Sequence, residues 1–258
     1  MTDAVQHLVA ALAAGQVEVV DLTQPLSEET PIMRLPEPFA NTPRFRLREL
    51  SRYDERGPAW YWNAFEGGEH TGTHFDAPIH WVTGQDKADV SQVPPGQLVA
   101  PAAVLDCADR VADDPDFLLE VDDIKAWESE HGAIPDGGWL LVRTGWDARS
   151  GSQTDFLNAD DKGPHTPGLS ATCARWLAEE SPVIGLGVET VGTDAGAAAG
   201  FDLMFPCHTL MHGAGKYGLT QLQNLASLPV QGTVLIAAPL KIVRGSGSPA
   251  RVLALVAG

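Results

Sequence analysis

The segment that begins at His70 concentrates side chains that bind metal ions. It reads HTGTHFDAPIH and places His70, His74, Asp76 and His80 within eleven residues. Imidazole nitrogen and carboxylate oxygen are the usual protein ligands of zinc, manganese and iron. Side chains two apart on an extended strand share a face, so the even spacing predicts that all four point the same way. Gly72 lies on that face without a side chain, which would leave room for an ion and a water.

A second segment is predicted to close the open side of this metal centre. In the sequence PCHTLMH, His208 and His212 are four residues apart and would share a face if the segment is helical. Taken singly, each is equally consistent with an ordinary core or surface histidine. Cys207 touches the same motif, but a buried structural thiol is the favoured interpretation for it.

Three tryptophans surround the metal motif in sequence. Trp60 and Trp62 would share one face of a strand that leads into the motif, and Trp81 comes just after it. These rings are predicted to bind substrate by stacking on a flat molecule, although aromatic residues on strands are more often ordinary core.

Two acidic residues end an apolar run that reads as a strand. Glu189 and Asp194 follow Val183–Val188, and α/β proteins commonly bind ligands where strands end. For Asp194, a capping or turn role is an equally good interpretation.

Composition restricts the function more than it identifies it. The 258 residues include 17 basic and 34 acidic side chains, a formal charge of −17 that disfavours nucleic acid and anionic membranes as partners. No apolar run is long enough to cross a bilayer, and the first residues lack the basic region of a signal peptide. The three cysteines form no CxxC pair, which favours a reducing compartment without disulfides. We therefore expect a cytoplasmic protein that acts on a small molecule.

The elements read from the sequence predict an α/β (mixed α+β) fold, one domain over residues 1–258 built around a mixed sheet. An N-terminal helix is expected within 1–16 and a Pro-rich surface arm over 22–44, which favours a homo-oligomer because such arms often pack on a neighbouring subunit. Further helices are predicted at 121–130, 172–180 and, more briefly, 219–225. The predicted strands are 18–22, 60–66, 103–107, 139–144, 183–189, 233–237 and 251–256.

The histidine segment resembles the signature His-x-Gly-Thr-His-x-Asp-x-Pro-x-His of the metal-dependent cyclase family, which includes kynurenine formamidases, isatin hydrolases and some dienelactone hydrolases. The likeness extends over nearly the whole chain. It implies a swivelling β/β/α domain that forms dimers or larger assemblies. It also implies that His70, His74 and Asp76 hold the metal, while His80 and His208 are catalytic.

One residue departs from the formamidase pattern. Members of that kind carry a glutamate where this chain has Gln221, and they use it with His208 to hold a second zinc. A neutral amide is a poorer ligand for a divalent ion, so Gln221 is at most a weak or second-site ligand. The resemblance then implies one Mn²⁺ per chain, with Zn²⁺ as the alternative, and leaves His212 for substrate binding.

Residue chemistry and resemblance both predict hydrolysis, because a metal held by imidazoles and a carboxylate activates water. The resemblance makes isatin, a flat cyclic amide, the leading substrate. The alternatives are a formamidase acting on N-formylkynurenine, a dienelactone-type lactone hydrolase and, outside enzymes, a module that binds a metal or ligand without catalysis. The intact His80 argues against that last alternative, since a metal buffer needs no base beside three ligands.

Overall fold

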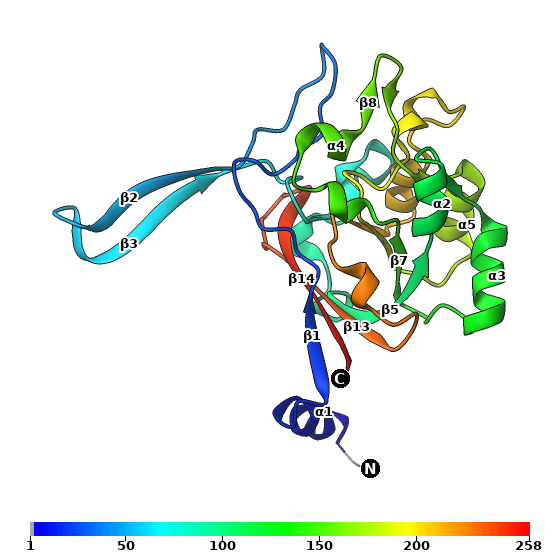
Figure 1. Cartoon of the computed structure of the whole chain (residues 1–258), viewed down its shortest axis with the longest axis horizontal. Coiled ribbons are helices and arrows are strands. Elements are labelled where there is room, and N and C mark those ends of the chain that lie inside the picture. Colours follow the sequence, from blue (N-terminus) through cyan, green and yellow to red (C-terminus); the bar gives the residue numbers. More distant parts are fainter. Residues whose placement is uncertain (1–2) are drawn as a thin grey trace.

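The protein, described here as a computed structural model of residues 3–258, is built around one mixed sheet (Figure 1). The strands of this sheet are β1 (Val17–Asp21), β4 (His74–Asp76), β5 (Val99–Asp106), β7 (Trp139–Arg143), β11 (Gly185–Val188), β12 (Tyr217–Thr220), β13 (Thr233–Pro239) and β14 (Gly247–Ala257). Their order is β1-β14-β13-β5-β7-β11-β12-β4, and β4 also pairs with β14. All strands except β1 therefore close into a barrel-like ring.

The ring combines parallel and antiparallel pairing. Strands β5, β7, β11 and β12 run parallel to their neighbours in that series, whereas β4, β13 and β14 pair antiparallel. Apolar side chains such as Phe75, Trp139 and Leu219 fill the inside of the ring. The mixed α/β fold predicted from the sequence is confirmed.

Helices cover the outer face of the parallel strands. Helix α3 (Val121–His131) and helix α5 (Ala171–Glu179) lie beside the short α2 (Ala108–Asp113) and enclose a second apolar core (Figure 1). Ser170 caps α5 by accepting a hydrogen bond from the Cys173 amide, as its sequence predicts. Both longer helices match the predicted ranges to within one residue.

Smaller elements complete this part of the chain. They include the short helix α4 (Gln153–Leu157). The short strand pairs are β6 (Leu118–Leu119) with β10 (Gly168–Leu169) and β8 (Ala159–Asp160) with β9 (Gly163–Pro164).

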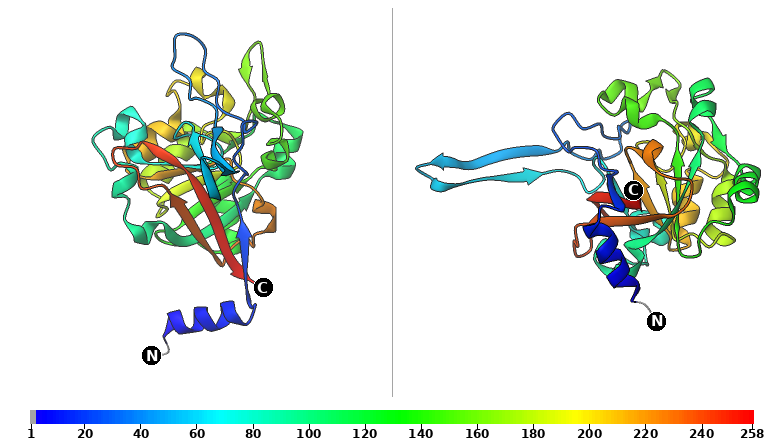
Figure 2. Two further views of the ribbon diagram at one scale, coloured as in Figure 1. Left: turned by 90° about the vertical axis from the view of Figure 1, so that its left-hand side faces the viewer. Right: turned by 60° about the horizontal axis from the view of Figure 1, so that its bottom comes forward.

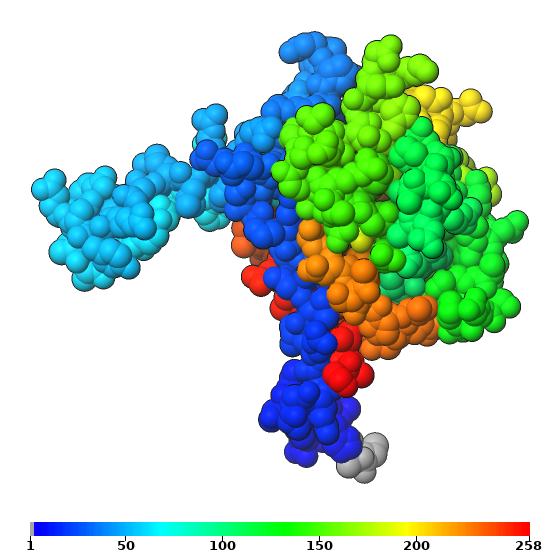
Figure 3. Space-filling view, in the orientation of Figure 1, coloured from blue at the N-terminus to red at the C-terminus, as the bar shows by residue number. Residues whose placement is uncertain are grey.

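Two elements stand away from this body. Strands β2 (Arg46–Asp54) and β3 (Gly57–Glu66) pair only with each other and form a long hairpin that projects into solvent (Figures 1 and 2). Helix α1 (Ala4–Ala13) extends from the opposite end of β1 and has no buried residue. Both are distinct protrusions in the space-filling view (Figure 3). Residues 1 and 2 of the predicted N-terminal helix lie outside the described range.

The structure corrects one predicted element. The predicted helix at 219–225 is wrong, because Tyr217–Thr220 forms β12, a central strand with every residue buried. The apolar residues of this segment fit a strand buried on both faces as well as they fit a helix. The irregular segment 22–44 is anchored by the buried Leu22 and Ile32, but residues 33–41 are all exposed on the surface. The element that projects from the body is the hairpin that follows it. Among residues 3–258, no helix is long and apolar enough to cross a membrane.

Candidate metal centre and active site

The histidine segment is not one strand, as the even spacing predicted. Only His74–Asp76 forms β4; Gly72 has a positive φ of 63° and turns the chain before it, and Pro78–His80 forms a 3₁₀ turn after it. The Gly72 position faces Leu26 and Thr30 and leaves no room for an ion, which corrects that prediction. The turns nevertheless return His70 and His80 to the same place, with their rings stacked at 3.8 Å between centroids.

Two imidazole nitrogens converge on the carboxylate of Asp76. His74 Nδ1–H donates to the carbonyl of Gly72 at 2.7 Å, which leaves Nε2 without a proton 3.4 Å from Asp76 Oδ1. His70 Nε2–H donates to Ser246 Oγ at 2.8 Å, because the Ser246 hydroxyl itself donates to Glu69. His70 Nδ1 then faces Asp76 Oδ1 at only 2.6 Å. A contact this short needs a proton or a cation between the two atoms, and two imidazole nitrogens beside one buried carboxylate fit a metal ion.

Two glycines on the neighbouring strands make room for the Asp76 carboxylate. Its partners in register on both neighbouring strands are glycines, Gly218 on β12 and Gly247 on β14. A Cβ on Gly218 would lie 2.9 Å from Asp76 Oδ2, and one on Gly247 would lie 2.6 Å from His70 Cε1. The glycines therefore leave the space that the buried carboxylate and the His70 ring occupy. Hydrogen bonds to Ser246 and Gly72 fix the two rings, as outer partners of metal ligands do.

A second group of possible ligands shares Asp76. His208 and His212 lie on a short π-helix (His208–His212), as the four-residue spacing predicted, with ring centroids 5.5 Å apart. One ligand atom each of Asp76, His208 and His212 lies within 4.8 Å of the others. His212 Nδ1–H donates to the carbonyl of Lys216 at 3.0 Å, so its buried Nε2 carries a lone pair that has no partner among the described residues.

Asp194 positions His208. Its hydrogen bonds from two backbone amides also fit the capping role that the sequence offered for it. Its carboxylate accepts hydrogen bonds from the backbone amides of Cys207 and His208 and lies 2.5 Å from His208 Nδ1. Burial would lower the pKa of His208, but the hydrogen bond and charge of Asp194 outweigh it and the pKa is raised. His208 Nε2 is thus directed to the histidine cluster.

His80 occupies the middle of this cluster. Its ring stacks on His70 and lies 5.6 Å from the His208 ring and 5.9 Å from the His212 ring, between centroids. Burial lowers its pKa to about 3, so the imidazole is neutral at pH 7. Trp81 packs beside it, 4.8 Å from the His208 ring, with its indole N–H donated to Thr209.

Gln221 is buried next to β12 with its side chain unsatisfied. It is fully excluded from solvent, has a positive φ of 54°, and neither amide atom has a hydrogen-bond partner within residues 3–258. Buried amides are almost always hydrogen-bonded, so a water, substrate or ion is expected there. Cys207 is a buried thiol whose pKa burial raises well above its usual value, which fits the structural role predicted for it.

The structure does not bring Trp60 and Trp62 to the cluster. Both lie on β3 of the projecting hairpin and are 45% and 56% exposed (Figure 1). Of the three predicted substrate-binding tryptophans, only Trp81 lies with the histidines of its own chain. The strand periodicity placed Trp60 and Trp62 on one face, with ring centroids 5.9 Å apart, but it contained no information on where the hairpin points.

Glu189, the other acidic residue at the end of an apolar strand, holds a loop together. Its Oε2 accepts hydrogen bonds from the amides of Thr144 and Trp146 and from the Thr144 hydroxyl. Glu189→Ala should lower the free energy of unfolding by about 3 kcal/mol, because two buried amides lose their acceptor. Glu189→Gln keeps an acceptor oxygen and should cost about 1 kcal/mol. Urea unfolding of the two variants checks this, and equal losses would contradict it.

Several residues of the site could not have been identified from local spacing. Ser246, itself hydrogen-bonded to Glu69, fixes the His70 ring. Thr220 Oγ1 lies 3.1 Å from His74 Nε2. Met33 lies near Gly192, which is itself close to His208. Ser246 is 176 residues from His70 in the chain. The pairing of β14 with β4 brings Ser246 to His70, and the pairing of β12 with β4 brings Thr220 to His74.

Comparison with known proteins agrees with this geometry. Residues 20–195 match the family model Cyclase. The chain is 50% identical over 256 residues to isatin hydrolase of Roseibium aggregatum, covering 98% of this chain and 97% of that protein. It is 31% identical over 190 residues to kynurenine formamidase of Salinibacter ruber, covering 70% and 74%.

Solved structures give the same result. An isatin hydrolase bound to the product analogue thioisatinate superposes with a TM-score of 0.96 at 49% identity, covering 99% of this chain and 98% of that one. Sequence and structure agree over nearly the full length, and the resemblance seen in the histidine segment is confirmed: this chain belongs to the cyclase family of hydrolases.

Proposed function

We propose that the protein hydrolyses isatin to isatinate with one divalent cation per chain, Mn²⁺ in preference to Zn²⁺. The observation that carries the proposal is the convergence of His70 Nδ1 and His74 Nε2 on Asp76, in a chain whose full-length relatives include isatin hydrolases. The donor set of two imidazoles and one carboxylate fits a catalytic cation.

His70, His74 and Asp76 would hold the ion. When bound, a divalent cation lowers the pKa of water and polarises a carbonyl oxygen. The neutral His80 ring would take a proton from the attacking water and return it to the leaving ring nitrogen, so that the amide opens to an amine and a carboxylate. His208, held by Asp194, would direct Nε2 at the developing oxyanion. Trp81 would provide a flat wall for the ring.

A formamidase that binds two metals is the second candidate, and the group of Asp76, His208 and His212 is the observation that favours it. Gln221 argues against it, because a neutral amide contributes no charge to a second cation site. The 31% identity to a kynurenine formamidase covers less of the chain than the identity to isatin hydrolase.

Paired assays would test this proposal. Protein stripped of metal with a chelator should not hydrolyse isatin, and Mn²⁺ should restore the activity, followed as loss of isatin absorbance. N-formylkynurenine and an aromatic lactone serve as competing substrates in parallel assays. Restored turnover of N-formylkynurenine alone would overturn the assignment in favour of the formamidase. Absence of turnover with all three would favour a binding module.

The metal count should respond to one side chain. Gln221→Glu adds a buried carboxylate, and we expect metal content to rise from about one to about two ions per chain when excess Zn²⁺ is present. Elemental analysis after desalting measures the content. Gln223→Glu, two residues along and partly exposed, is the control and should leave the count unchanged. A count of two in the unaltered protein would contradict the single-ion proposal.

Two further properties belong to the proposal. Three buried, unbridged thiols suit the reducing cytoplasm. The exposed hairpin favours a homo-oligomer, for which a dimer is the simplest closed assembly.

A further inference from the structure

Gly192 is a buried glycine that neither the backbone nor the packing of the protein requires. Every other buried glycine among residues 3–258 either has a positive φ or would place a Cβ 3.0 Å or less from another atom. Gly192 has neither property, because its φ lies outside the left-handed region and a Cβ there would make only two ordinary van der Waals contacts. Alanine could therefore occupy this position without backbone strain.

The two contacts place Gly192 beside the ring of His208. A Cβ on Gly192 would lie 3.7 Å from Met33 Cε and 3.9 Å from His208 Cε1. Apart from its chain neighbours, no further atom of residues 3–258 lies within 4 Å of that Cβ position. Cε1 is bonded to Nε2, the atom of His208 that is directed to the histidine cluster. The space that Gly192 leaves open therefore lies next to the proposed oxyanion donor.

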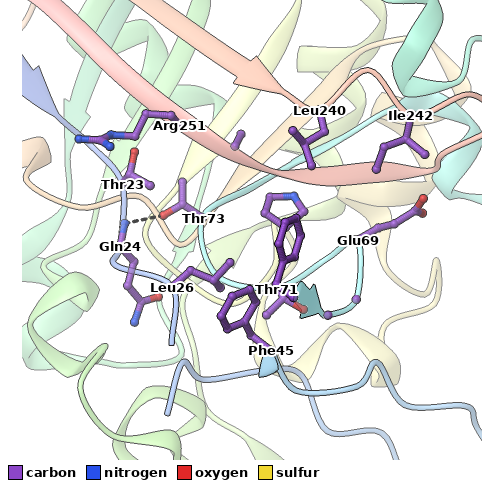
Figure 4. A pocket seen from close by; sticks show the side chains of 15 residues that line it. Thr23, Gln24, Leu26, Phe45, Glu69, Thr71, Thr73, Leu240, Ile242 and Arg251 are labelled. Atoms are coloured by element: carbon purple, nitrogen blue, oxygen red, sulfur yellow. Dashed lines mark hydrogen bonds between the residues drawn. The ribbon is translucent and has the colours of Figure 1, made fainter. Parts of the chain in front are cut away.

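The backbone that carries Met33 is fixed at two points. Gln24, earlier in the same segment, donates its backbone amide to Thr73 Oγ1 at 2.8 Å (Figure 4). Gln153 holds Ile32, the residue before Met33, by accepting from its amide at 3.1 Å and donating to its carbonyl at 2.8 Å. Met33 itself is 37% exposed, and its flexible, polarisable thioether suits contact with an aromatic ligand. An adaptable side chain thus stands on an anchored stretch of chain.

We infer that Gly192 and Met33 form a wall of the substrate pocket beside His208 and limit the size of the ring that can enter. This rests on the proposed hydrolysis of a flat cyclic amide and names two residues that contact it. A buried glycine with no structural requirement leaves a space, and this space adjoins both a thioether and the proposed oxyanion donor. Trp81 borders the same imidazole, with ring centroids 4.8 Å apart, so a planar bicyclic substrate would meet an aromatic and a thioether surface.

Gly192→Ala tests this wall in the full-length protein loaded with Mn²⁺. The added methyl group should raise the KM for isatin about 10-fold and leave kcat within about threefold, because one methyl group of crowding is enough for discrimination of this size. Metal content should not change, and Tm should not fall, because alanine at an ordinary φ lowers the entropy of the unfolded chain. Gly200→Ala is the matched control: it lies in the same connection, is exposed, has no atom within 4 Å of its Cβ position and should leave KM unchanged.

A double variant separates contact with the substrate from an indirect effect on His208. Met33→Ala removes the side chain nearest to the added methyl group, so Gly192→Ala/Met33→Ala should have a lower KM for isatin than Gly192→Ala alone. An unchanged KM in Gly192→Ala, or a rise in KM that Met33→Ala does not reduce, would overturn the wall. A fall in kcat at constant KM would also overturn it and assign Gly192 to the positioning of His208.

The unaltered protein separates failure of the wall from failure of the proposed function. Normal isatin turnover with unaffected variants would overturn the wall alone. Turnover of N-formylkynurenine and not of isatin would overturn the proposed substrate, and the same shifts in KM, measured with that compound, would still support the wall. Turnover of neither compound nor of an aromatic lactone would overturn both.

Discussion

Asp76→Asn should abolish both metal binding and hydrolysis. Asp76 contributes the single charge of the proposed ligand set, and its carboxylate lies 2.6 Å from His70 Nδ1 and 3.4 Å from His74 Nε2. Asparagine has the same shape but no charge, so kcat/KM should fall by about 10³-fold or more, which is about 4 kcal/mol of transition-state stabilisation. Elemental analysis and the isatin assay measure the two losses.

The same variant should also lose stability without a metal. Burial would raise the pKa of Asp76, but the charge of His74 and the hydrogen bond of His70 at 2.6 Å outweigh it and hold that pKa well below its usual range. Because this carboxylate is stabilised in the folded state, metal-free Asp76→Asn should be less thermally stable than the metal-free unaltered protein. Mn²⁺ should raise the Tm of the unaltered protein by mass action and leave that of the variant unchanged.

Asp161→Asn makes the same change of charge at an exposed turn and serves as the control. It should keep both the activity and the response of Tm to Mn²⁺. An Asp76→Asn protein that still binds one equivalent of Mn²⁺ would contradict the assignment of the ligand set.

The sequence was sufficient to predict which side chains lie together but not the path that assembles them. Residue type and proximity along the chain predicted that His70, His74, Asp76 and His80 cluster, and their side chains do lie together. The assumed mechanism, one strand with a constant alternation, failed because Gly72 and the turn at Pro78 break the strand on both sides of β4. The alternation of side chains along a strand carries no information about backbone turns that depend on packing.

Contacts between distant segments limited the prediction in the same way. Asp194 had a capping role and a ligand-binding role as equal interpretations, and only the position of the π-helix beside it shows that it holds His208. The segment 219–225 has apolar residues that fit a helix or a strand equally well. Its pairing with β11 and β4 decides for the strand, and that pairing is a property of the whole sheet.

The hairpin shows the limit most clearly. Trp60 and Trp62 were correctly predicted to share a face of a strand, and the substrate was the partner assumed for that face. In the structure the hairpin projects from the body, and both tryptophans are about half exposed. A sequence pattern can show that one face of a strand is apolar. Which molecule or segment packs on that face depends on where the strand lies in the fold.

His80→Gln should lower kcat without removing the metal. The residue lies outside the proposed ligand set, stacks on His70 and contacts both downstream histidines, so it can exchange a proton with water and with the leaving nitrogen. Loss of a general acid–base group costs typically 10²- to 10⁴-fold. We expect a fall in kcat of about 10³-fold, a KM within about threefold of the original and one Mn²⁺ per chain. His131→Gln, on α3 and outside the cluster, should match the unaltered protein. Loss of the metal in His80→Gln would make His80 a ligand, and an unchanged kcat would assign the proton transfer to His208 or His212.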